Sequence, residues 1–484
     1  MDVGTRADMQ QTEGMAGGKK GKSAKFTAAP LDDFQLPAGF PEHLKRPAAD
    51  VVADLIRAAA AAAYGSQRRP KAVDVAVDSL TVLGQLEVAT ELHADHVISA
   101  VLAGVITELY ERGWQPLDLP HVVRRAQDEE SAELATLAVI EQSIFGRPLG
   151  AAPHTWLDQL AALGAEVPDA QATGDPKTDG STAGGEVPAP TSQRRGQLGD
   201  STATLVTDWA LSHGMRPADG WRAALRVIGQ LQELPGITRL VPPPSKWGMT
   251  PARTHLSSPQ DLKMLTRIRA LLAKAESTTF PAEAETFSAK AQDLMTRHEI
   301  DAAMVDRSGE VGGEQTDPTI HSVRVHIDDP YAREKAQLLA TLGGVNVVRV
   351  IWDDVNGMAV MVGRELELEL VEILFTSLLI QATRAMVASG EHSGDLRSPS
   401  FRRAFLLSYA ARIGERLSEV EKVALEQAKQ QYGTDLVPVL ANRAEAVDVE
   451  FVRLFPNTRT GGGRQVNADG WWAGRAAADS AVIT

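Results

Sequence analysis

Apolar residues recur at helical spacing along most of the first part of the chain. Val97, Val101 and Val105 follow one another every four residues, and similar stripes run through residues 47–165. A stripe of this period forms one face of a helix, which must be buried against other helices. The pattern therefore predicts a helical N-terminal domain, a bundle, over residues 47–165.

The periodicity is lost in two stretches of the chain. Residues 1–46 and 166–201 are dominated by small and polar residues, and such segments bury too little apolar surface to order themselves. We expect a disordered tail over residues 1–46 and a flexible linker over residues 166–201. Helical spacing resumes over residues 202–241 and stops at Pro242, because proline cannot continue a helix. A helical subdomain is predicted there.

The clearest start of a helix lies at residue 258. Ser258 suits the N-cap and Pro259 the first helical position. Ser277 and the two threonines after it interrupt the apolar stripe, and a second stripe follows. Residues 258–301 are therefore predicted to form a helical hairpin.

In the last third of the chain the period changes to two. Val323, Val325 and Ile327 alternate with polar residues, and a turn over residues 353–357 separates two further apolar runs, so a three-stranded sheet is expected. Long helices follow. The helix over residues 366–386 is apolar on nearly every side, which predicts its burial against the sheet.

The predicted fold class is mainly α with a C-terminal α+β domain over residues 320–484. It combines a helical N-terminal bundle, a disordered linker, a helical hairpin and a small three-stranded sheet packed with long helices. Near the end of the chain, Trp471 and Trp472 precede Gly474 and three alanines. Such a small-residue face predicts a helix that another helix approaches closely.

Composition narrows the classes of protein that this chain can represent. It has 484 residues, of which 43% are hydrophobic and 23% charged, as in average globular proteins. It has no cysteine, which excludes disulfide scaffolds, thiolate zinc sites, iron–sulfur clusters and cysteine nucleophiles. Its formal net charge of −14 repels nucleic acid and anionic membranes.

The chain shows no targeting pattern. The first thirty or so residues lack the apolar core of a signal peptide. No run of about 18 apolar residues is free of charge. We therefore expect a cytoplasmic protein without a membrane-spanning helix.

A dense motif lies between residues 263 and 301. It consists of Ala-Glu-Ser-Thr at residues 275–278, Glu-Ala-Glu at 283–285, and Ala-Lys-Ala-Gln-Asp-Leu-Met-Thr-Arg-His ending at His298. This segment resembles a short domain family of unknown function found in bacteria and bacteriophages, and the region after it resembles the α+β domain that commonly follows this hairpin. The resemblance implies an architecture and brings no activity, cofactor or catalytic residue with it.

Three arginines fall within an apolar stripe of the long helix predicted to begin at Phe401. Arg402, Arg412 and Arg416 share one sector at about 100° per residue. A buried guanidinium group needs an anion, and two hypotheses supply one.

In the first hypothesis the arginines pair with Glu365, Glu369 or Glu372 of the preceding helix, or reach the solvent at its rim. In the second they form a site for a phosphate or carboxylate, joined by Arg459 and Arg464 from a nearby loop.

Other candidates for chemistry are few. His298 suits acid–base catalysis, but a cation in the last turn of a helix also complements the helix dipole. His321 and His326 are five residues apart on a predicted strand and face opposite sides. The phosphate-loop-like string from Ala16 to Ser23 lacks a strand before it and a helix after it. We predict no metal and no cofactor.

These observations favour a non-enzymatic interaction or regulatory scaffold protein whose partner is another protein. The alternative is an enzyme or binding domain for an anionic ligand, with Arg402, Arg412 and Arg416 as the anion clamp. A nucleic-acid-associated protein is a second alternative, which the net charge of −14 disfavours.

Overall fold

The computed structural model describes most of the predicted helices and strands. The described residues are 48–65, 69–90, 94–145, 149–165, 205–248, 259–277, 290, 294–297, 300, 320–390, 398–433, 436–458 and 468–479. The predicted tail and linker, and most of the second hairpin helix, lie outside these residues.

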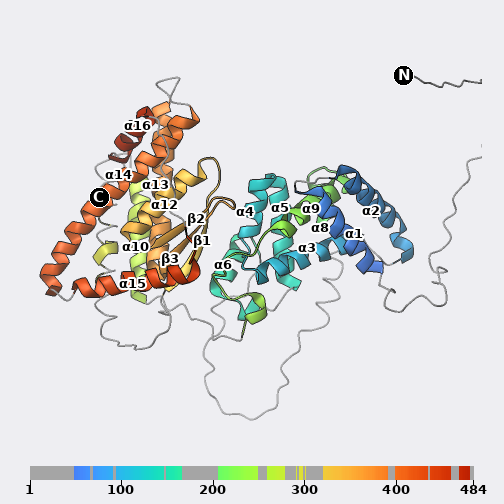
Figure 1. Ribbon diagram of the computed structural model, residues 1–484, viewed down its shortest axis with the longest axis horizontal. Helices are drawn as coiled ribbons and strands as arrows, with labels where there is room; N and C mark the ends of the chain where they lie inside the picture. Colours follow the sequence, from blue (N-terminus) through green and yellow to red (C-terminus); the bar gives the residue numbers. More distant parts are fainter. Residues whose placement is uncertain are drawn as a thin grey trace, which may run out of the picture.

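The described chain forms two lobes that lie side by side (Figure 1). We call residues 48–248 the helical lobe and residues 259–479 the sheet lobe. The predicted fold class, mainly α with a C-terminal α+β part, is confirmed.

The helical lobe consists of helices packed around one core. Its elements are α1 (Ala48–Ala63), α2 (Pro70–Thr90), α3 (Ala94–Glu111), α4 (Asp118–Ala126), α5 (Glu129–Phe145), η3 (Leu149–Ala151), α6 (His154–Ala162), α8 (Leu205–Ser212), α9 (Pro217–Glu233) and η5 (Pro244–Lys246). Leu225, Ile228 and Leu231 of α9 are fully buried in the core that α1 and α3 also supply. Residues 205–241 therefore complete the same core as the helices before the linker.

The sheet lobe surrounds a small antiparallel sheet. Its elements are α10 (Pro259–Ser277), β1 (Ile320–His326), α12 (Ala332–Val345), β2 (Arg349–Asp353), β3 (Met358–Arg364), α13 (Glu365–Gly390), α14 (Pro399–Tyr432), α15 (Leu436–Leu454) and α16 (Ala468–Asp479). The strand order is β1-β3-β2, with Val323 opposite Met361 and Ile351 opposite Val360. The predicted strands and their turn are confirmed.

Both faces of the central strand β3 are covered. Ala359 and Met361 pack in the core formed with α12, α13 and α14, whereas Val360 and Val362 pack against α15. A strand buried on both faces is apolar at every position, which accounts for the run Met358–Val362. Helix α12, between β1 and β2, was not predicted, although its buried residues Leu338, Leu339 and Leu342 have helical spacing.

Helix α13 is the one helix of the described residues that is long and apolar enough to cross a membrane by length and composition alone. Its segment Glu365–Ala388 has a mean hydropathy of 1.5. A helix in a protein core passes the same test. Here α13 packs against α10, α12, β3 and α16, as the prediction of a helix buried against the sheet requires.

Helices α14 and α16 approach each other closely. Gly470 and Gly474 of α16 face α14, and a Cβ atom at either position would overlap backbone carbonyl oxygens, those of Phe401 and Phe405. The predicted small-residue face is confirmed. Trp472 points away from this contact and is 69% exposed.

Candidate functional site at the contact between the lobes

Two of the predicted anion-clamp residues come together at the end of α16. The Arg412 guanidinium contacts the carboxylate of Asp479 and, at 2.8 Å, that of Glu415. The buried Arg416 guanidinium donates hydrogen bonds to the carbonyl oxygens of Ala478 and Asp479. Both arginines therefore neutralise the negative end of the α16 dipole.

The carboxylates that bind Arg412 are Asp479 and Glu415, not the residues of α13 that the pairing hypothesis named. Glu369 of α13 pairs with Arg269 of α10, and Arg412 is satisfied by its own helix and by α16. The geometric reason is that α16 lies along α14 at the level of Arg412 and Arg416, which the sequence pattern of α14 alone does not reveal.

The remaining predicted site residues do not join them. Arg402 is half-buried on α14, ten residues before Arg412, which corresponds to about 15 Å along a helix axis. His298, Arg459 and Arg464 lie outside the described residues, so their part in an anion site stays a prediction.

A second set of charged side chains meets at the contact between the lobes. Asp118 and His121 come from α4 of the helical lobe, and Arg324 and His326 come from β1 of the sheet lobe. We call these four residues the lobe-contact cluster. Figure 1 shows α4 lying beside the ends of β1 and β2.

Asp118 lies at the centre of the cluster and is fully buried. Its Oδ2 accepts hydrogen bonds from the Arg324 guanidinium and, at 2.8 Å, from the backbone N–H of Gln115. Its Oδ1 lies 2.8 Å from Nε2 of His326. Both carboxylate oxygens are thus satisfied, as a buried charge requires.

The Arg324 side chain reaches from β1 into the helical lobe. Besides Asp118 it contacts the carbonyl oxygen of Thr238 at 3.1 Å, and the side chain is 3% exposed. A guanidinium group that is buried in the partner lobe fixes the register of the two lobes, because a small shift within the closed contact would leave two unpaired charges away from water.

His121 binds the turn between β2 and β3. Its Nε2 lies 3.1 Å from the carbonyl oxygens of both Asn356 and Gly357, so this nitrogen must carry the proton. The buried Nδ1 makes no hydrogen bond among the described residues and lies 3.5 Å from Oδ1 of Asp328. The tautomer of a neutral His121 is therefore set by backbone carbonyl groups.

The pKa values of the cluster follow from burial and from the neighbouring charges. Burial raises the pKa of Asp118, but Arg324 and His326 together outweigh burial and hold it below its usual range. Burial, and the charge of His326 when protonated, lower the pKa of His121, although Asp328 acts in the opposite direction. The folded protein therefore favours ionised Asp118 and neutral His121.

Sequence reasoning missed this cluster although α4 carries a signal for it. Asp118, His121 and Arg125 are three and four residues apart and lie on one face of the helix, and Arg125 pairs with Asp329 of the sheet lobe. A polar face on a helix is ordinarily exposed to solvent. Only the arrival of Arg324 and His326 from β1, two hundred residues later, turns this face into a contact.

The described residues hold no group of three or more His, Asp or Glu side chains arranged to bind a metal ion. The cluster has two imidazoles and one carboxylate, but its carboxylate is occupied by a guanidinium group. What the arrangement provides is an ionic contact between the two lobes, centred on Asp118.

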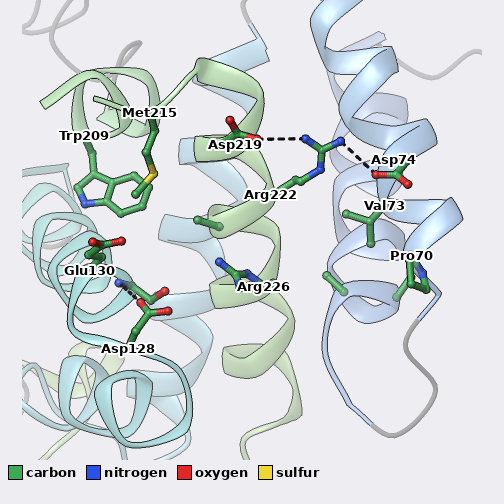
Figure 2. A pocket seen from close by; sticks show the side chains of 14 residues that line it. Pro70, Val73, Asp74, Asp128, Glu130, Trp209, Met215, Asp219, Arg222 and Arg226 are labelled. Atoms are coloured by element: carbon green, nitrogen blue, oxygen red, sulfur yellow. Dashed lines mark hydrogen bonds and ion pairs between the residues drawn. The ribbon is translucent and has the colours of Figure 1, made fainter. Parts of the chain in front are cut away.

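The helical lobe also carries a groove of about 430 Å³ (Figure 2). Helix α2 forms one wall, the start of α5 and the α8–α9 region form the other, and α9 forms the floor. Its charged lining residues are Asp74, Asp128, Glu130, Asp219, Arg222 and Arg226. We call it the acidic groove, since four carboxylates face two guanidinium groups.

Comparison with known proteins identifies one segment of the chain. Residues 263–302 match a family described as protein of unknown function (DUF2786), which confirms the resemblance seen in the sequence of the hairpin. No curated protein and no solved structure matches the chain. The matched segment contains neither the lobe-contact cluster nor the acidic groove, so the match to this family says nothing about the function of either site.

Proposed function

We propose that the protein is a non-enzymatic interaction and regulatory protein whose two lobes are held in one arrangement by the lobe-contact cluster. The observation that carries this proposal is that three members of the cluster bind one another across the contact between the lobes. Asp118, Arg324 and His326 direct their hydrogen bonds at one another and at the backbone of the opposite lobe.

Catalytic side chains must reach a substrate, so an active site leaves part of their hydrogen-bonding capacity open. The Asp118 carboxylate accepts from Arg324, Gln115 and His326, and the candidate clamp residues Arg412 and Arg416 are bound to the end of α16. These observations support binding rather than catalysis as the activity.

The regulatory part of the proposal rests on the polar character of the contact between the lobes. A contact between domains ordinarily permits relative motion unless it is large and apolar. A partner that binds better to separated lobes would shift the population toward that arrangement. We propose that this partner is a cytoplasmic protein, since the net charge of −14 opposes nucleic acid.

The test compares partner binding by three forms of the full chain. The wild type, Arg324→Gln and Arg349→Gln are expressed and cross-linked in the cells from which the chain comes, and bound proteins are quantified by mass spectrometry. Arg349 is the matched control because its exposed pair with Asp448 of α15 lies within the sheet lobe.

We expect the same proteins to be recovered with the wild type and Arg349→Gln, and their amounts to change several-fold with Arg324→Gln. Recovery of no protein above background with any form, or turnover of a small molecule by the purified wild type, would overturn the proposal.

A further inference from the structure

The carboxylates of the acidic groove are unequally occupied. The Arg222 guanidinium binds Asp74 at 3.1 Å and Asp219 at 3.3 Å, and Figure 2 shows these contacts at one end of the groove. At the other end Asp128 accepts a hydrogen bond from the backbone N–H of Ser131. Glu130 lies beside it on an exposed turn of α5.

Apolar surface lies between these two ends. Trp209, Met215 and Val73 line the groove together with alanines of α1 and α9. With Arg222 bound to two carboxylates, the nearby cationic groups left for Asp128 and Glu130 are Arg226, which acts on Asp128, and His213, on which Glu130 acts. A ligand that complements the groove therefore carries positive charge next to an apolar side chain.

The chain itself contains such a segment outside the described residues. Residues 19–26 read Lys-Lys-Gly-Lys-Ser-Ala-Lys-Phe, with four lysines and a terminal phenylalanine. No acidic residue occurs between Glu13 and Asp32. This concentration of positive charge is opposite in sign to the groove and to the chain as a whole.

The segment is within reach of the groove. Ala62 and Ala63, at the end of α1, line the groove, and α1 begins at Ala48, about 24 Å away along the helix axis. The 22 residues from Phe26 to Ala48 have a root-mean-square span of about 26 Å if they are disordered. A tether whose span matches the distance gives the highest effective concentration.

We infer that the acidic groove binds the chain's own lysine-rich segment, residues 19–26, with lysines at Asp128 and Glu130 and Phe26 against the half-buried side chain of Met215. This inference goes beyond the proposed function, because it involves neither the lobe-contact cluster nor a second protein.

The absence of cysteine from the chain makes a direct test practical. Nitroxide labels are attached to Ser23→Cys and to Val75→Cys, a 62% exposed position next to Asp74 on α2. Pulsed dipolar spectroscopy then measures the distance between the labels in the full chain. A second pair, Ser23→Cys with Val452→Cys on the sheet lobe, is the control for the position of the segment.

We expect a narrow short-distance population for the first pair at low salt. Replacing Lys19, Lys20, Lys22 and Lys25 by glutamine abolishes it, and 1 M salt does the same because the Debye length falls to about 3 Å. The groove variant Asp128→Asn with Glu130→Gln also loses it. The control variant Glu108→Gln with Asp158→Asn makes the same charge change on exposed helix positions of the same lobe. We expect this variant to keep the short-distance population.

Excess synthetic peptide with the sequence of residues 17–27 should displace the tethered segment and reduce the short-distance population. A broad distribution in the chain with intact lysines would overturn the inference. A short distance that survives the lysine replacements would overturn it as well. Either result leaves the partner-capture experiment on Arg324→Gln unaffected, so the two proposals fail separately.

Discussion

The Asp118 carboxylate shows how one buried charge depends on its neighbours. It is fully buried at the start of α4 and is surrounded by the Arg324 guanidinium, the His326 imidazole and a backbone N–H group. Removing any one donor leaves the others facing an incompletely satisfied anion. The cost of a substitution here is therefore the cost of an unpaired buried charge, not that of one lost hydrogen bond.

Replacing Arg324 by methionine keeps an unbranched side chain of similar reach to the aliphatic part of arginine and removes the charge that Asp118 needs. We expect the free energy of unfolding to fall by about 3–5 kcal/mol, as for other broken buried ion pairs. Arg333→Met, which breaks a surface pair with Asp354, should cost less than about 1 kcal/mol. Urea unfolding followed by circular dichroism measures both, and equal losses would show that Arg324 is not held as described.

The pH dependence of stability follows from His121. Its pKa is lowered from 6.5 in the folded protein, so below pH 6.5 the unfolded chain binds a proton that the folded chain does not. Stability from this group is complete above pH 6.5 and is lost as the pH falls toward the lowered pKa. The lowered pKa of Asp118 acts with the same sign at lower pH.

We therefore expect His121→Gln to remove part of the loss of stability between pH 7 and pH 5. The measured quantity is the difference between wild type and variant, because burial raises the pKa of Glu372, and that of Glu141 to about 7, and these groups act with the opposite sign. Parallel profiles for the two proteins would mean that His121 does not titrate in this range.

At the scale of elements, α16 packs closely on α14 because two of its residues, both glycines, have no side chain. Gly470 and Gly474 are one helical turn apart and allow the backbone of α16 to approach Phe401 and Phe405. The sequence revealed this face through its run of glycine and alanine. It did not reveal that Arg412 and Arg416 secure the end of α16, since nothing in α14 states which helix lies beside it.

Gly474→Ala tests this close approach. Alanine favours a helix, but its methyl group would overlap α14, so we expect destabilisation by about 1–3 kcal/mol. Gly104→Ala is the control, because this helical position in α3 has open space around it and should be neutral or stabilising by up to about 1 kcal/mol. Thermal unfolding distinguishes the two, and similar shifts in Tm would contradict the packing described.

At the scale of the whole molecule, the contact between α4 and the sheet holds the two lobes in one arrangement. Arg324 and His326 lie on β1 and contact α4, while the turn between β2 and β3 contacts His121. Met358 adds an apolar contribution, since it packs in the core of the helical lobe. These interactions join the core of the helical lobe to the sheet lobe in one arrangement.

Loss of the lobe-contact cluster should therefore change the shape of the molecule before it changes the secondary structure. For Arg324→Gln combined with His121→Ala we expect a larger radius of gyration by small-angle X-ray scattering and an unchanged far-ultraviolet circular dichroism spectrum. Arg216→Gln removes an exposed ion pair between the N-cap of α9 and Asp219. This variant should leave the radius of gyration and the circular dichroism spectrum unchanged. An unaltered radius in the double variant would show that other contacts hold the lobes together.

The sequence by itself determined the elements that depend on short-range patterns. Helical stripes, the turn at residues 353–357 and the continuous apolar run of β3 each reflect neighbours within one element, and the small-residue face of α16 does so too. Their physical cause is the periodic burial of side chains, which is written locally in the order of residues.

Only the tertiary structure decided which polar side chains meet. Asp118 and Arg324 are 206 residues apart, and each by itself has the pattern of an exposed charge on a helix or a strand. A buried ion pair is defined by two distant positions at once, and its stability depends on the surrounding loss of water. For that reason the sequence suggested an anion-binding site at Arg412 and Arg416, where the structure places the end of α16. The contact between the lobes was not predicted.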